Sequence, residues 1–147
     1  MPLTGNTVSV CGLSADTDYE LYIVRTDDSA ACSETRLVRV GFVPGKVINY
    51  LHPDDTAYSF SGTSLDSPSL VKLTSGRLIA SMGVHKSQQY GENLTLLYYS
   101  DDGGESWNYL CELFPLEWGS LFVDGEKLYC LGVSRPYGDL LIGCSHS

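Results

Sequence analysis

An internal repeat in the second half of the chain constrains the fold more than any other feature. The segment PSLVKLTSGRLIAS (68–81) predicts a strand, a tight turn at Ser75–Gly76 and a second strand. The segment GSLFVDGEKLYCLG (119–132) has the same pattern, with its turn at Asp124–Gly125. No window of the chain keeps apolar residues at helical spacing for three turns, so we expect an all-β fold.

A third apolar stretch follows each hairpin, LTLLYYS at 94–100 and DLLIGCS at 139–145. The offset between the two copies is 51 residues from Ser69 to Ser120. A β-rich repeat of this period is typical of propeller blades or a related array, in which differences in length fall in the loops.

The segment SDDGGESW (100–107) joins the third strand of the first copy to NYLCEL (108–113), which predicts a hairpin turn and a fourth strand. It fits the pattern S-x-D-x-G-x-x-W through Ser100, Asp102, Gly104 and Trp107. This pattern resembles the Asp-box, or BNR repeat, of sialidase-like β-propellers.

The aspartate, glycine and tryptophan of the box indicate a structural role. An aspartate accepts hydrogen bonds from the amides of its own turn, glycine adopts a backbone shape that a Cβ forbids, and tryptophan buries a large ring. An EF-hand loop would need D-x-D-x-D-G and a glutamate at position twelve, which this stretch lacks, so no metal site is expected.

The resemblance implies that residues 58–147 form about one and a half to two blades of four-stranded antiparallel sheet. A propeller closes with ~4–8 blades, so we expect the remainder of the propeller to be missing from this chain. The family also implies an extracellular or cell-surface location, although MPLTGNTVSV lacks the features of a signal peptide.

The first 43 residues predict three strands, at 6–11, 19–26 and 35–42. Leu13 and Tyr19, separated by a polar turn, have the spacing of a tyrosine corner. Residues 1–43 resemble the C-terminal part of a fibronectin type III module, a short β-sandwich-like segment. Residues 44–57 are then a linker punctuated by proline and glycine.

Composition excludes some partners. With 18 acidic and nine basic residues the net charge is −9, which disfavours nucleic acid, and no apolar stretch is long enough to span a membrane. The five cysteines contain no C-x-x-C motif, which argues against a zinc knuckle. Four of them lie in apolar, strand-like contexts, so we expect buried reduced thiols, with a Cys11–Cys32 bridge as the alternative in an exported chain. His52 stands alone in the sequence and suggests no role.

Two motifs expected of a sialidase are absent. A typical sialidase has R-I-P before the first strand of a blade, and its arginine helps to clamp the substrate carboxylate. Aligning Pro68 with that proline places Asp66 at the arginine. The acid/base aspartate after the second strand aligns with Gly83, and its neighbouring arginine with His85.

Other residues at the same end of the repeat are candidates for a sugar site. Asp66 is a candidate catalytic carboxylate, with a turn cap as the alternative. His85, together with Lys86, is a candidate for substrate binding, with a solvated loop as the alternative. Glu117 and Trp118, which we match to Ser67 and Pro68, precede the second copy; Trp118 suits stacking on a sugar, with packing between blades as the alternative. Tyr137 and Asp139 are weaker candidates.

The expected function is a glycan-active, sialidase-like propeller protein, an exo-acting glycoside hydrolase in its full-length form. The alternative is a non-catalytic propeller module that binds carbohydrate or protein. The expected partner is a carbohydrate, and no cofactor is expected.

Overall fold

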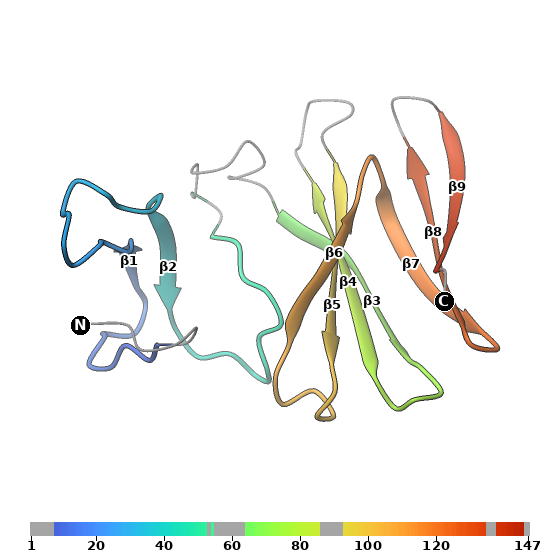
Figure 1. Ribbon diagram of the computed structural model, residues 1–147, viewed down its shortest axis with the longest axis horizontal. Coiled ribbons are helices and arrows are strands. Elements are labelled where there is room, and N and C mark those ends of the chain that lie inside the picture. Colours follow the sequence, from blue (N-terminus) through green and yellow to red (C-terminus); the bar gives the residue numbers. More distant parts are fainter. Residues whose placement is uncertain (1–7, 53, 55–63, 86–92, 135–137, 146–147) are drawn as a thin grey trace.

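The computed structural model describes residues 8–52, 54, 64–85, 93–134 and 138–145, with Ser64 and His85 described by their backbones alone. These residues form three antiparallel sheets of two, four and three strands and no helix, which confirms the all-β class (Figure 1). None of the sheets closes on itself. The described part of the chain therefore contains no helix that could cross a membrane.

The four-stranded sheet is formed by the first copy of the repeat and the segment after it. Its strands lie in the order β3-β4-β5-β6. They are β3 (Ser64–Lys72), β4 (Leu78–His85), β5 (Leu94–Ser100) and β6 (Asn108–Leu113). Gly76 has a φ of 93° in the β3–β4 turn, a conformation that favours glycine. β5 and β6 span the residues predicted for them.

The second copy of the repeat forms the three-stranded sheet, in the order β7-β8-β9. Its strands are β7 (Glu117–Asp124), β8 (Lys127–Ser134) and β9 (Asp139–Cys144). The β7–β8 turn is formed by Gly125 and Glu126, one residue later than the predicted Asp124–Gly125, because Asp124 still pairs with Lys127. Gly125 has a φ of 61°.

The core of the molecule lies between these two sheets, because β7 packs across β3, β4 and β5. Its buried apolar residues are Ile79, Leu97, Leu116, Leu121 and Cys130. Hydrogen bonds also hold β7, and Leu116 directly before it, against the first sheet. The Leu121 N–H donates to the Ser69 hydroxyl at 3.0 Å, and the Thr95 hydroxyl donates to the Leu116 carbonyl at 3.0 Å.

Each first strand contains a β-bulge at the same place in the repeat. The pairing register shifts between Asp66 and Ser69 in β3, and between Glu117 and Ser120 in β7. A bulge adds an unpaired residue and re-aims the side chains next to it. The bulged residues Ser67 and Trp118 have positive φ values of 46° and 53°, which are uncommon for residues other than glycine.

The bulges correct the alignment made from the sequence. Glu117 corresponds to Asp66, and Trp118 corresponds to Ser67, each at the offset that relates Ser69 to Ser120. The match of Glu117 and Trp118 to Ser67 and Pro68 was therefore wrong by one residue. Both copies of the repeat place an acidic residue directly before the bulge.

The N-terminal sheet contains β1 (Thr17–Leu21) and β2 (Arg36–Val40), and an isolated bridge joins Val24 to Cys32. The Ser14 N–H donates to the Tyr19 hydroxyl at 2.8 Å, the contact expected of a tyrosine corner. Residues 8–11 form no strand, so that part of the predicted strand at 6–11 was wrong, and residues 6 and 7 lie outside the described residues. A strand needs a partner, and among the described strands β1 pairs only with β2.

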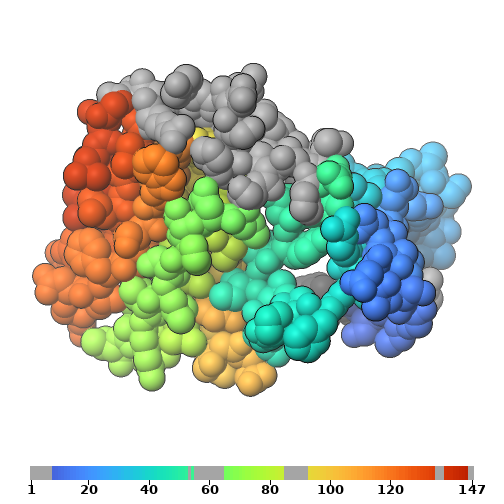
Figure 2. Space-filling model, turned by 180° about the vertical axis from the view of Figure 1, so that it is seen from behind, coloured from blue at the N-terminus to red at the C-terminus, as the bar shows by residue number. Residues whose placement is uncertain are grey.

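The linker is anchored on this sheet by His52, which is buried. The His52 Nδ1 accepts a hydrogen bond from the Asp54 N–H at 3.0 Å, and its Nε2 lies 3.2 Å from an oxygen of Asp18. Arg39 holds the same Asp18 carboxylate at 2.6 and 2.9 Å, and its N–H donates to the Tyr50 hydroxyl. His52 therefore has a structural role that the sequence did not suggest. The described linker residues, 44–52, lie between the N-terminal sheet and β3 in Figure 2.

The five cysteines are free, so the alternative Cys11–Cys32 bridge is not formed. Burial raises the thiol pKa of Cys130, which is buried, and of Cys111, which is partly buried. Cys11, Cys32 and Cys144 are exposed, so the expectation of buried thiols was wrong for these three. Two of them lie in the N-terminal segment, where apolar residues such as Val10 and Val24 are also exposed.

Candidate functional site

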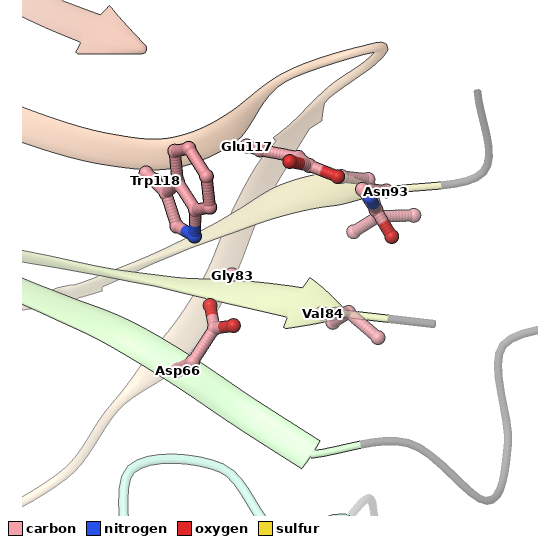
Figure 3. Close-up of a pocket in the computed structure, with 7 residues that line it drawn as sticks. Asp66, Gly83, Val84, Asn93, Glu117 and Trp118 are labelled. Carbon is pink, nitrogen blue, oxygen red and sulfur yellow. The ribbon is translucent and has the colours of Figure 1, made fainter. Parts of the chain in front are cut away.

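A shallow pocket opens between the four-stranded sheet and the start of β7 (Figure 3). Its empty volume is about 150 Å³, part of which is open solvent. It is lined by Asp66, Gly83, Val84, Asn93, Leu94, Glu117 and Trp118. The pocket thus brings together three of the predicted site residues from the two copies of the repeat, Asp66, Glu117 and Trp118.

Asp66 reaches the pocket from β3, where it pairs with Gly83 of β4. A Cβ built on Gly83 would clash with the carboxylate oxygen Oδ1 of Asp66. The carboxylate therefore occupies space that is free only because residue 83 is glycine, and Figure 3 shows it pointing toward that residue. Because β3 begins at Ser64, Asp66 lies inside the strand and does not cap a turn before it.

Glu117 and Trp118 enter the pocket from the bulge at the start of β7. Glu117 is buried and its side chain extends toward Asn93, whereas the side chain of Trp118 points toward Asp66 across Gly83 (Figure 3). Trp118 is 48% exposed. Packing against the first sheet therefore leaves about half of the surface of this residue uncovered among the described residues.

Among the residues that the structure describes, none of the other candidates lines the pocket. His85 ends β4 opposite Ser64, and the structure describes only its backbone. Lys86 and Tyr137 lie outside the described residues. Asp139 begins β9, is exposed and does not line the pocket.

The predicted box forms the turn between β5 and β6. Asp102 Oδ1 accepts hydrogen bonds from the Ser100 hydroxyl at 2.7 Å and from the Ser106 N–H at 2.9 Å. The Ser106 hydroxyl donates to the other carboxylate oxygen. The Ser100 oxygen accepts from the Gly104 N–H at 2.8 Å. The turn is thus closed from inside by two side chains of the box and by Ser106, which the pattern does not include.

The electrostatics of this turn follow from the same contacts. The hydrogen bond from the Ser106 hydroxyl, supported by the Ser106 N–H and the Ser100 hydroxyl, holds the pKa of Asp102 well below its usual range. Gly104 has a φ of 98°, and the Trp107 ring N–H donates to its carbonyl at 3.1 Å.

The box and the pocket lie at opposite ends of β5, because the box begins at Ser100 while Asn93 and Leu94 line the pocket. Among the residues that the structure describes, no group of three potential metal ligands comes together. The hydrogen bonds within the turn support a structural role for the box.

Comparison with protein-family models, curated proteins and solved structures finds no match to this chain.

Proposed function

We propose that this chain is part of a glycan-active, sialidase-like propeller protein, a glycoside hydrolase in its full-length form, and that the pocket is its sugar site. The observation that carries the proposal is the convergence of Asp66, Glu117 and Trp118, at equivalent bulges of two adjacent sheets, on a single pocket. A four-stranded meander followed by a three-stranded one, with β7 of the second packed across β3, β4 and β5 of the first, agrees with blade architecture.

The chemistry of the three side chains suits a sugar. An exposed indole face packs against the C–H face of a pyranose, and carboxylates accept hydrogen bonds from its hydroxyls. Most glycosidases use two carboxylates on either side of the scissile bond. Asp66 supplies one carboxylate from the first sheet and Glu117 supplies the other from the second.

The same residues argue against a sialoside as the substrate. Asp66 lies where a sialidase would have an arginine for the sugar carboxylate, and Glu117 adds a second acidic side chain to the pocket. Two carboxylates repel an anionic sugar. We therefore propose a neutral glycan as the substrate.

The second candidate is a propeller that binds a sugar without cleaving it. Its support is the shallow, open shape of the pocket, part of whose space is open solvent, whereas typical ligand sites are concave and enclose most of the ligand. Both candidate functions use Asp66, Glu117 and Trp118, and they differ in whether the bound sugar is cleaved.

A panel of neutral aryl glycosides and an aryl sialoside, assayed with the full-length protein, separates the candidates. We expect release from a neutral glycoside, a loss of more than tenfold in kcat/KM in Asp66→Asn and Glu117→Gln, and no change in the matched control Asp139→Asn. Binding of a neutral sugar with no release from any glycoside would favour the second candidate.

Fluorescence provides a readout of binding that is independent of turnover. The chain has two tryptophans, so a Trp107→Phe variant reports on Trp118 alone, and a neutral sugar should change its emission. Cleavage of the sialoside, or unchanged activity and binding in Asp66→Asn, Glu117→Gln and Trp118→Ala, would contradict the proposal.

A further inference from the structure

The buried histidine that joins the linker to the N-terminal sheet has contacts that fix its protonation state. His52 is 1% exposed. Its Nδ1 accepts a hydrogen bond from the Asp54 N–H at 3.0 Å, so this nitrogen carries no proton. A neutral imidazole then carries its proton on Nε2, which lies 3.2 Å from the Asp18 carboxylate. One ring nitrogen therefore contacts the linker and the other contacts β1.

Protonation of His52 would break its contact with the linker. Both ring nitrogens of an imidazolium are donors, so a proton on Nδ1 would face the Asp54 N–H. Two donors cannot hydrogen-bond to each other, and the backbone at Asp54 must then turn away. Histidine is the side chain that ordinarily changes charge between about pH 5 and 8, so the contact is sensitive to mild acid.

The contact with Asp18 does not offset this loss, because Asp18 already has a cationic partner. Arg39 donates to the two oxygens of the Asp18 carboxylate at 2.6 and 2.9 Å. These hydrogen bonds hold the pKa of Asp18 well below its usual range, and the contact with His52 acts in the same direction. A charged His52 would add a second cation to a carboxylate whose charge is already balanced, and a buried charge without its own partner is costly.

Two further titratable residues, Tyr50 and Asp54, lie beside His52 in the linker. The rings of Tyr50 and His52 meet edge to face, with centroids 6.4 Å apart. The Tyr50 hydroxyl accepts the Arg39 N–H at 3.0 Å, which is a second attachment of the linker to the N-terminal sheet. Tyrosine and aspartate side chains do not ordinarily change charge between about pH 5 and 8. The Tyr50 attachment should therefore persist when the contact at Asp54 is lost.

We propose that His52 is a pH-sensitive latch on the linker. In its neutral form it holds Asp54 at the N-terminal sheet, and its protonation releases Asp54 while the Asp18–Arg39 pair and the Tyr50 contact remain. The released end of the linker is the end that leads toward β3. The latch uses none of the residues of the sugar pocket and does not depend on the function proposed for it.

NMR spectroscopy of the whole 15N-labelled chain between about pH 8 and 5 tests the proposal. At the upper end we expect the ring-nitrogen shifts of an imidazole protonated on Nε2, and an Asp54 amide protected from hydrogen exchange. In acid we expect imidazolium shifts and a loss of more than tenfold in that protection, after correction for the intrinsic pH dependence of exchange. The amides of the core residues Leu97 and Cys130 should keep their protection, which distinguishes local release from unfolding.

His52→Asn is the decisive variant. Its amide oxygen takes the place of Nδ1 as an acceptor for the Asp54 N–H but gains no proton in this pH range. It should keep the Asp54 amide protected at both ends of the range. The matched control is His85→Asn at the end of β4, which should behave like the parent.

Four results would overturn the proposal. Two come from the parent alone, so the test stays valid if His52→Asn fails to fold: a protected Asp54 amide beside a charged His52, or a His52 that stays neutral down to about pH 5. The others are a pH dependence in His52→Asn equal to that of the parent, and its loss in His85→Asn.

Discussion

Leu121→Ala tests the packing of the second sheet on the first. Leu121 is 6% exposed at the centre of the core, where it contacts the face formed by Ile79 and Leu97. The change removes three carbon groups worth about 0.8 kcal/mol each when buried, so about 2.4 kcal/mol of transfer free energy is lost. The cavity left behind raises the expected loss of unfolding free energy to about 3–4 kcal/mol.

Leu70→Ala is the matched control, since Leu70 occupies the same place in the first copy of the repeat and is 61% exposed. Scaling the transfer term by its buried fraction gives a loss of about 1 kcal/mol. Urea unfolding followed by far-UV circular dichroism measures both, provided that the slope with denaturant is unchanged. Equal losses of unfolding free energy in the two variants, or a loss below about 1 kcal/mol in Leu121→Ala, would refute the conclusion that β7 packs into the core between the two sheets.

Two further predictions concern single positions. Gly119→Ala should lower the unfolding free energy by about 1–3 kcal/mol, because its Cβ would lie 2.8 Å from the Thr95 side chain. The control Gly143→Ala should be neutral, because there is open space around Gly143. Equal melting temperatures for the two variants would contradict the prediction. The low pKa of Asp102 predicts that its stabilisation is present above the ordinary value of 3.8 and is lost as pH falls below it. The melting temperatures of the parent and Asp102→Ala should therefore differ at neutral pH and converge in acid, and a difference independent of pH would count against the assignment.

Local patterns in the sequence predicted the regular strands well. The apolar stretch at 94–100, the box after it and the glycines at 76 and 125 predicted β5, β6 and two hairpins, because short apolar runs and turn chemistry are local properties. The box also has local determinants, although the pattern does not show that Ser106 completes it.

The errors arose where structure depends on distant residues. The match of Glu117 to Ser67 departed from the offset of 51 residues between Ser69 and Ser120, which places Glu117 at Asp66. The bulges themselves were not predicted, because no propensity signals the left-handed conformation of Ser67 and Trp118. His52 appeared incidental because its partner Asp18 is 34 positions away in the sequence. Likewise, the strand predicted at 6–11 would need a neighbouring strand, and the sequence does not show whether one exists.

The close approach of Asp66 to Gly83 has a consequence for any attempt to map this pocket by mutation. A methyl group at position 83 would displace the Asp66 carboxylate, so Gly83→Ala would imitate the loss of Asp66 although residue 83 has no functional group of its own. Shortening residue 66 should relieve the clash, which makes the effects of the two positions non-additive. In an alanine scan, Gly83 would therefore be taken for a functional residue although the change acts by displacing Asp66. Only the double variant would show that the two positions are coupled.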